Sequence, residues 1–139
     1  MNFQEAKKYL NRGYMARQRI ESKKERLERW RAELTNATVR LDSEKVGNSS
    51  DKQQMEKTVI AIIDLETQIE NDISNLAKLE LEIQQEIDLV EDELQKTVLE
   101  YRHLNFMKWD SVCLKLNYSS RQIFNIYKSA ILSFMKNYK

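Results

Sequence analysis

A row of hydrogen-bonding side chains lies near the C-terminal end of the chain, in the segment SRQIFNIYKSAIL (120–132). At 100° per residue, one face of a helix over this segment carries Arg121, Gln122, Asn125, Lys128 and Ser129. Ser120 is included in this row because it lies early enough in the helix to meet a phosphate. These residue types hydrogen-bond to base edges in the major groove of DNA and to backbone phosphates. Phe124 lies at the border of the row, where it can pack inward or touch a thymine methyl group. The row predicts contact with double-stranded DNA.

The opposite face of this helix is apolar, and a second amphipathic segment precedes it. The apolar face carries Ile123, Ile126, Tyr127, Ala130, Ile131 and Phe134. The segment WDSVCLKL (109–116) has an apolar face of Trp109, Val112, Cys113 and Leu116. The turn Asn117-Tyr118-Ser119 separates the two, and Ser119 stands three residues before Gln122, the spacing of a capping box. The pattern predicts a helix-turn-helix, with a plain helical corner as the alternative.

Charge is divided unevenly along the chain. Residues 101–139 carry seven Lys or Arg and one acid, Asp110, a balance of +6. Residues 1–45 carry 12 basic and 7 acidic side chains, and residues 46–100 carry 4 and 14, so their balances are +5 and −10. The basic C-terminal segment suggests an anionic target such as DNA phosphate, against the alternative of a solvated surface. The opposite signs of the two earlier segments favour antiparallel pairing between them.

One pair of side chains has the spacing of metal ligands. Glu100 and His103 form a Glu-x-x-His motif, which di-iron proteins use on bundle helices. Glu66 and Glu80, the glutamates that would complete a site, lie 20 to 34 residues earlier on the same helix. They are therefore on the order of 30 Å or more away, and we expect no metal, no cofactor and surface positions for Glu100 and His103. With one histidine, one cysteine and no Gly-rich phosphate loop, the sequence also predicts no enzyme activity.

The elements that must position these residues are long helices. Pro is absent and only two Gly occur, so the chain lacks the turn residues of a sheet protein and an all-α fold is predicted. From about residue 2 to residue 41 an apolar stripe recurs at Leu10, Ile20, Leu27, Leu34 and Leu41. Gly13 weakens this helix by about 1 kcal/mol without having to break it. A turn follows in SEKVGNSSDKQ (43–53), where Ser50 stands three residues before Gln53 as a helix cap.

A second long helix is predicted from about residue 51 to residue 91. Two heptad rows define its seam, one of Val59, Ile73, Ile87, Leu94 and Tyr101 and the other of Ile62, Ile69, Leu76, Ile83, Val90 and Leu104. Glu66 and Glu80 interrupt the first row, where they can reach basic residues of the first helix or fix the register. Asp92, three residues before Gln95, indicates a new helix or a kink, with a continuous helix as the alternative. Asn105 is predicted to be a left-handed residue at a helix end.

Together these elements predict two parts. Residues 1–91 form a long antiparallel, coiled-coil-like hairpin, and residues 92–139 form a helix-turn-helix module. Dimerisation into a four-helix bundle would cover the side positions Ile63, Leu65, Leu79 and Leu89, so we expect a homodimer. No apolar run reaches the roughly 18 residues that span a bilayer, and the N-terminal MNFQEAKKYL is not typical of a signal peptide. We therefore expect no membrane contact and a cytoplasmic location.

The segment YRHLNFMKWDSVCLKLNYSSRQIFNIYKSAIL (101–132) resembles region 4 of bacterial sigma factors. That region has an arginine and a leucine, a short turn, a helix with a buried pair, and a serine-led recognition helix. The pattern is matched in order by Arg102, Leu104, Val112, Leu116, Ser119, Ile123, Ala130 and Leu132. With AKKYLNRG, RIESKKERLERWRAEL and MEKTVIAIIDLETQIENDI, nearly the whole chain is similar to small regulators of Gram-positive phages and prophages, related to the RinA and ArpU late-gene activators. The family often has Thr where Lys108 stands, a helix cap that this chain lacks.

The resemblance implies a phage-encoded transcriptional regulator that binds DNA through its sigma region-4-like helix-turn-helix in the cytoplasm of a bacterial host. It also allows contact with host RNA polymerase. The alternative, from another class, is a helical adaptor that binds a host protein through the coiled hairpin. The residues favour the regulator, because the polar row coincides with the basic segment.

Overall fold

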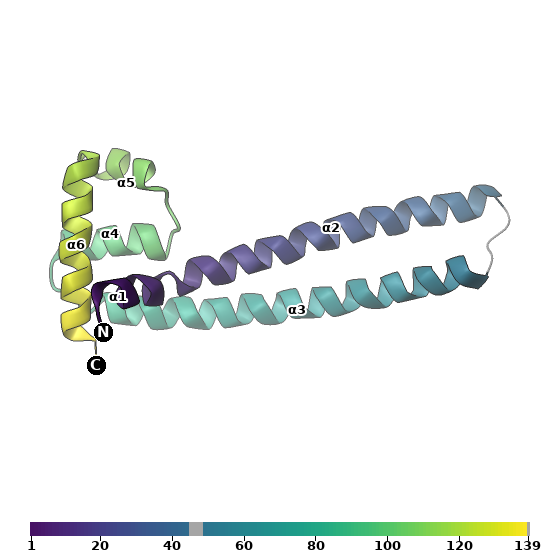
Figure 1. Ribbon diagram of the computed structural model, residues 1–139, viewed down its shortest axis with the longest axis horizontal. Coiled ribbons are helices and arrows are strands. Elements are labelled where there is room, and N and C mark those ends of the chain that lie inside the picture. Colours follow the sequence, from purple (N-terminus) through teal and green to yellow (C-terminus); the bar gives the residue numbers. More distant parts are fainter. Residues whose placement is uncertain (45–48, 139) are drawn as a thin grey trace. The chain divides into compact units, whose positions relative to one another are not determined.

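The computed structural model describes residues 1–44 and 49–138, and the regular structure in that part of the chain is entirely helical (Figure 1). The helices are α1 (Phe3–Leu10), α2 (Arg12–Glu44), α3 (Ser49–Ile87), α4 (Glu93–His103), α5 (Trp109–Leu116) and α6 (Ser120–Asn137). The all-α class is confirmed. Two compact units divide the chain: a terminal unit of Met1–Arg17 and Leu76–Lys139, and a hairpin unit of Gln18–Asn75. No helix in the described ranges is long and apolar enough to cross a bilayer.

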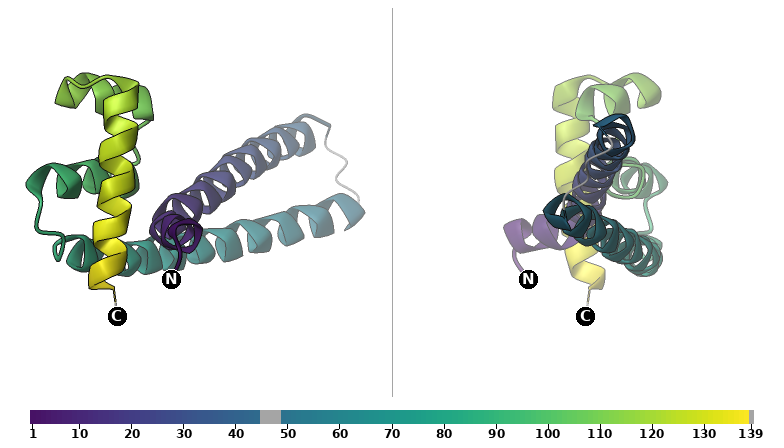
Figure 2. Two further views of the ribbon diagram at one scale, coloured as in Figure 1. Left: turned by 60° about the vertical axis from the view of Figure 1, so that its left-hand side comes forward. Right: turned by 90° about the vertical axis from the view of Figure 1, so that its right-hand side faces the viewer.

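In the hairpin unit, α2 and α3 run side by side in opposite directions (Figures 1 and 2). Its small core consists of Leu27, Ile62, Leu65 and Ile69, with Trp30 and Leu34 packed against it. Ion pairs between Lys23 and Asp72 (2.5 Å) and between Arg31 and Glu66 (2.6 Å) link the helices. Glu66 therefore reaches a basic residue of the preceding helix, which is one of the two roles predicted for it.

The seam of the hairpin follows one of the two predicted heptad rows. Ile62 and Ile69 of the second row are buried, whereas Val59 and Ile73 of the first row are 40% and 46% exposed. A pair of helices buries a single stripe on each, and Val59 and Ile73 lie on the flank of that stripe. Val59 and Ile73 are thus available for contacts that the hairpin itself does not make.

The four side positions expected to face a second hairpin have different surroundings. Leu65 is only 4% exposed because it packs inside the hairpin unit, and Leu79 packs against the core of the terminal unit. Ile63 and Leu89 are 55% and 57% exposed. Two of the four positions therefore need no second copy of the chain to cover them.

The first long helix is interrupted at Asn11, which separates α1 from α2. Arg12 Nε donates to the carbonyl oxygen of Tyr9 (2.9 Å), and the Arg12 guanidinium lies 3.7 Å from the centroid of the Tyr9 ring. This local hydrogen bond competes with the regular helical bond of that carbonyl. The interruption thus coincides with the contacts between Arg12 and Tyr9, while Gly13 lies within α2.

The helix boundaries near the hairpin turn also differ from those expected. α2 continues to Glu44, and α3 already includes Ser49, so Ser50 lies within α3 instead of capping it. Residues 45–48 of the predicted turn lie outside the described residues.

The terminal unit has one apolar core, to which both ends of the chain contribute. α6 packs against α1, α4 and α5, and α4 packs against α5 (Figure 1). The buried side chains are Ala6, Leu10, Ile83, Ile87, Val90, Val98, Leu99, Val112, Ile123, Tyr127, Ala130, Ile131 and Phe134. The helices predicted for residues 92–139 therefore share their core with residues that precede position 92.

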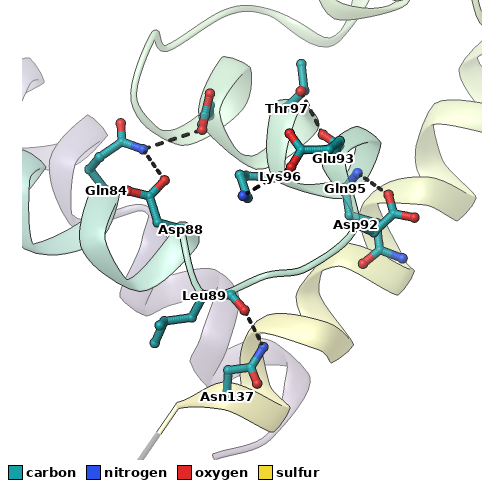
Figure 3. A network of polar contacts seen from close by, with 10 residues as sticks. Gln84, Asp88, Leu89, Asp92, Glu93, Gln95, Lys96, Thr97 and Asn137 are labelled. Carbon is teal, nitrogen blue, oxygen red and sulfur yellow. Dashed lines mark hydrogen bonds and ion pairs between the residues drawn. The ribbon is translucent and has the colours of Figure 1, made fainter.

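The break predicted at Asp92 is confirmed. α3 ends at Ile87, and the Asp92 carboxylate accepts a hydrogen bond from the N–H of Gln95 (2.9 Å) at the start of α4 (Figure 3). The Gln95 side-chain oxygen accepts from the hydroxyl of Ser133 on α6 (2.7 Å). Asn137 on α6 donates to the carbonyl of Leu89 (3.1 Å; Figure 3). These bonds fix both the loop after α3 and the start of α4 to α6.

Candidate nucleic-acid interface

A tight turn joins α5 to α6. Asn117 ends α5 in the left-handed conformation (φ 60°, ψ 46°), and the N–H groups of Asn117 and Tyr118 both donate to the carbonyl of Cys113. Asn adopts this conformation more readily than most residues that have a side chain. Ser119 then caps α6: its hydroxyl accepts from the N–H of Gln122 (3.2 Å), and the Gln122 side chain accepts from the N–H of Ser119 (2.9 Å). The predicted turn and capping box are confirmed.

The packing of α6 determines which of its faces meets solvent. Five of the six side chains predicted to point inward are buried: Ile123, Tyr127, Ala130, Ile131 and Phe134. Ile126, the sixth, is half-buried and packs against the same core. Because side chains recur every 3.6 residues, this burial turns the polar row of α6 outward.

All six residues of the predicted polar row are exposed: Ser120, Arg121, Gln122, Asn125, Lys128 and Ser129. They do not form a single cluster. Ser120 and Arg121 line an open, mostly apolar hollow of about 400 Å³ together with Trp109, Cys113, Ile123 and Phe124. Asn125 and Ser129 line a different, shallower hollow of about 260 Å³ with Asp92, Leu94, Gln95 and Ile126. The row therefore has two edges with different neighbours.

The two edges differ in charge. Lys128 Nζ lies 5.6 Å from the centroid of the Phe124 ring, and Phe124 lines the same hollow as Arg121. This edge of the row therefore has two cations. The other edge borders the carboxylate of Asp92, the cap of α4. α6 as a whole carries three cations, Arg121, Lys128 and Lys136, and no acid. An anionic ligand is favoured at the edge with Arg121 and disfavoured at the edge with Asp92.

A chain of polar and aromatic contacts supports α6 from behind. Arg102 on α4 donates to the carbonyl of Met107 (2.9 Å), and its guanidinium lies 4.7 Å from the centroid of Trp109. The Trp109 ring meets the ring of Tyr127 edge to face at 4.7 Å. The hydroxyl of Tyr127 is 3.0 Å from Nε2 of His103, which closes the chain of contacts on α4. These contacts fix α4, α5 and α6 relative to one another.

His103 is not the surface residue expected from the sequence. Its side chain is only 1% exposed, and its Nδ1 is buried without a hydrogen-bond partner among the described residues. Burial, followed by the positive charges of Arg102 and Lys7, lowers the pKa of His103 to about 3. Burial also raises the pKa of Tyr127 to about 12, against a smaller opposite effect of Arg102. Both side chains are therefore neutral near pH 7.

The Glu-x-x-His motif is likewise part of the packing. Glu100 is half-buried, and its carboxylate accepts a hydrogen bond from the side chain of Gln84 on α3 (3.4 Å). Within residues 1–44 and 49–138, no group of three His, Cys, Asp or Glu side chains is arranged to hold a metal ion. The sequence signal that could have revealed the buried role of His103 is its place one helical turn after Leu99, which is fully buried.

The loop between α4 and α5 departs from the sequence prediction at one residue. The left-handed residue is Phe106 (φ 56°), not Asn105. The Phe106 ring lies 6.3 Å from the ring of Tyr14 and 5.2 Å from the guanidinium carbon of Arg17, both on α2. A Cβ added at Gly13 would come within 3.5 Å of the same ring. The contacts of the Phe106 ring with Tyr14 and Arg17 accompany the left-handed backbone, and the sequence around Asn105 does not reveal them.

The residue before α5 lacks the cap that its position requires. Lys108 occupies the N-cap with extended backbone angles (φ −68°, ψ 151°) and makes no side-chain capping hydrogen bond. Ser119 has nearly the same backbone angles at the start of α6 (φ −70°, ψ 162°) and does cap its helix. The loss of a cap predicted at Lys108 is confirmed.

The sequence is similar to a known protein family. The model of a family described as a protein of unknown function, DUF1492, matches residues 34–134. No curated protein matches the sequence, and no solved structure matches it. The matched range includes most of the hairpin unit, α4, α5 and nearly all of α6. The chain therefore belongs to the DUF1492 family of uncharacterised proteins.

Proposed function

We propose that the protein is a transcriptional regulator that binds double-stranded DNA by inserting the exposed face of α6 into the major groove. The observation that carries this proposal is the combination of a capped α6, an inward face fixed by five buried side chains, and an outward row of hydrogen-bonding residues. Proteins with a helix-turn-helix present the second helix to DNA in this way. The resemblance of residues 101–132 to sigma region 4 supports the same reading.

The charge around α6 indicates how the helix would lie on DNA. The edge with Arg121 and Lys128 faces phosphates, because both cations are exposed and α6 carries no acid. The edge with Asn125 and Ser129 borders Asp92, whose carboxylate repels phosphate. Asn125 and Ser129 are therefore better suited to uncharged base edges, and Gln122 has its side-chain oxygen engaged by Ser119.

The proposal extends to the biological setting. We place the regulator in the cytoplasm of a bacterial host, encoded by a phage or prophage, with host RNA polymerase as a further partner. The support for this setting is the resemblance to the RinA- and ArpU-related regulators over nearly the whole chain.

The experiment that tests DNA binding begins with selection of bound duplexes from a random DNA pool, followed by fluorescence anisotropy titration of the selected site. Arg121→Ala and Lys128→Ala are each expected to weaken binding by about 1–3 kcal/mol, or roughly 5- to 150-fold. Each should also make the slope of log K against log salt concentration shallower by about one, the value expected for the loss of one phosphate contact.

The matched control is Lys136→Ala, which removes the same charge from an exposed position of the same helix. Lys136 lies about 22 Å along the helix from Arg121, beyond the part that a groove accommodates, so the affinity should stay within twofold of the unaltered protein. Equal effects of all three substitutions would indicate nonspecific attraction by net charge. The absence of any selected sequence would contradict the proposal.

A further inference from the structure

An apolar patch is exposed on α3 within the hairpin unit. The α3 patch consists of Val59, Ile60 and Ile63, which are 40%, 59% and 55% exposed. Val59 and Ile60 also line an open hollow of about 540 Å³ with Lys52, Met55 and Glu56. Contiguous exposed apolar side chains with polar neighbours are typical of interaction surfaces, whereas single ones are ordinary. The patch is thus wide enough to receive another apolar side chain beside Val59.

The residues along this face of α3 have a symmetric order. Lys52, Val59, Ile63 and Glu70 are separated by seven, four and seven residues, so the spacing is the same from either end. At 100° per residue they fall within an arc of about 40° on the helix. Lys52 precedes Ala61 by nine residues, and Glu70 follows it by nine. Within this arc the face has an apolar centre, a cation on one side and an anion at the matching distance on the other. Glu56 and Glu66 lie just outside the arc on opposite flanks, and Glu66 is paired with Arg31.

Such a face complements itself when a second helix runs in the opposite direction. A two-fold axis at the level of Ala61 places Val59 of each copy against Ile63 of the other. The same axis places Lys52 of each copy opposite Glu70 of the other, giving two ion pairs. A parallel arrangement would instead bring Lys52 to Lys52 and Glu70 to Glu70, which costs free energy.

We propose that the α3 patch is a homodimer interface, in which α3 of a second copy of the chain packs antiparallel across Val59, Ile60 and Ile63. Symmetric dimers use the same surface on both copies, and the order Lys52, Val59, Ile63, Glu70 meets that requirement. Of the four side positions considered from sequence alone, only Ile63 belongs to this surface. The assignment does not depend on DNA binding, because every residue in it lies on α3 within Gln18–Asn75.

The first test measures the mass of the full chain by sedimentation equilibrium over a range of micromolar concentrations. The unaltered protein should be a dimer, and Val59→Gln or Ile63→Gln should weaken dimerisation at least about tenfold, since each substitution occurs twice in the interface. Leu81→Gln is the matched control, because Leu81 is 60% exposed on the same helix outside the patch. The control should leave the dimer unchanged. A monomeric unaltered protein, or a dimer insensitive to both patch substitutions, overturns the proposal.

The second test examines the direction of pairing by charge exchange. Lys52→Glu alone and Glu70→Lys alone each place like charges at both ends of the interface, so dimerisation should weaken about fivefold or more at low salt. The double variant K52E/E70K restores both ion pairs with reversed sign and should recover the original affinity. Circular dichroism checks that every variant keeps its helix content. Failure of the double variant to recover the affinity excludes the antiparallel register.

Discussion

His103 shows at the residue scale how a polar group is used to position α6. Its ring is inclined by 30° to that of Tyr127, with centroids 5.7 Å apart, and its Nε2 hydrogen-bonds to the Tyr127 hydroxyl. A buried pair of this kind has one favourable geometry, because a displaced hydroxyl would leave two polar groups unsatisfied in an apolar core. The pair therefore selects one placement of α6 against α4, which apolar contacts alone specify less sharply.

The buried state of His103 predicts a particular dependence of stability on pH. The pKa falls from 6.5 to about 3 in the folded chain, so the unfolded chain binds the proton more tightly. Stability from this group is complete above pH 6.5 and is lost as the pH falls towards 3, by up to about 1.4 kcal/mol per pH unit. Urea unfolding at a series of pH values, compared with His103→Gln, isolates this contribution from those of the carboxylates. The slope should be smaller in the variant between pH 6 and pH 4.

The same prediction has a direct spectroscopic check, since the chain contains one histidine. The proton NMR signal of its ring should stay constant from about pH 8 to pH 5 in the folded protein and titrate near 6.5 in urea. A native signal that titrates near 6.5 would mean that the side chain is in contact with water, and the contact with Tyr127 would have to be abandoned.

At the scale of single elements, the start of α5 is the place where one substitution should stabilise the protein. Lys108 already has the backbone geometry of a cap but no side-chain acceptor. Lys108→Ser should supply one and raise the free energy of unfolding by about 1 kcal/mol. Lys108→Ala is the control, since it removes the same charge without supplying an acceptor. In thermal unfolding, Lys108→Ser should be more stable than both the unaltered protein and Lys108→Ala. Equal stability of Lys108→Ser and Lys108→Ala would show that α5 gains nothing from a cap.

Local spacing explains which of these elements the sequence could predict. The Asn117 turn, the Ser119 cap and the inward face of α6 all depend on residues within a few positions of one another. The hydrogen bond of His103 joins it to Tyr127, 24 residues later in the chain, and the left-handed backbone of Phe106 is accompanied by packing of its ring against Tyr14 and Arg17 on α2. Contacts between residues so distant in sequence leave no periodic signal, so the first group was predictable and the second was not.

The candidate site also has features set by local spacing, which could be predicted, and features set by distant contacts, which could not. The six residues of the polar row could be identified because a helical period places them opposite an apolar face, and all six are exposed. Their separation into one edge with Arg121 and another with Asp92 could not, because Asp92 precedes α4 and is brought beside α6 only by the packing of the helices. The sequence thus indicates which residues face outward, and the fold determines the charge beside each.

For the molecule as a whole, the terminal unit changes what the smallest DNA-binding fragment should be. The α6 core includes Ala6 and Leu10 from α1, Ile83 and Ile87 from the end of α3, and Val90 from the loop between α3 and α4. Each buried Leu, Ile or Val contributes about 1.5–3 kcal/mol, and a domain of under 60 residues has little stability to spare. A module cut at residue 92 loses all five side chains and exposes the apolar groups that they cover.

We therefore expect the isolated fragment 92–139 to be mostly unfolded by circular dichroism, without a cooperative urea transition. A second variant, in which a flexible Gly/Ser linker replaces residues 18–75 and leaves the whole terminal unit, should keep a cooperative transition. If the short fragment unfolds as cooperatively as this variant, α1 and the end of α3 are dispensable. If only the linked variant folds, a regulator built on α6 needs both ends of its chain to hold that helix, and truncation at either end should abolish DNA binding.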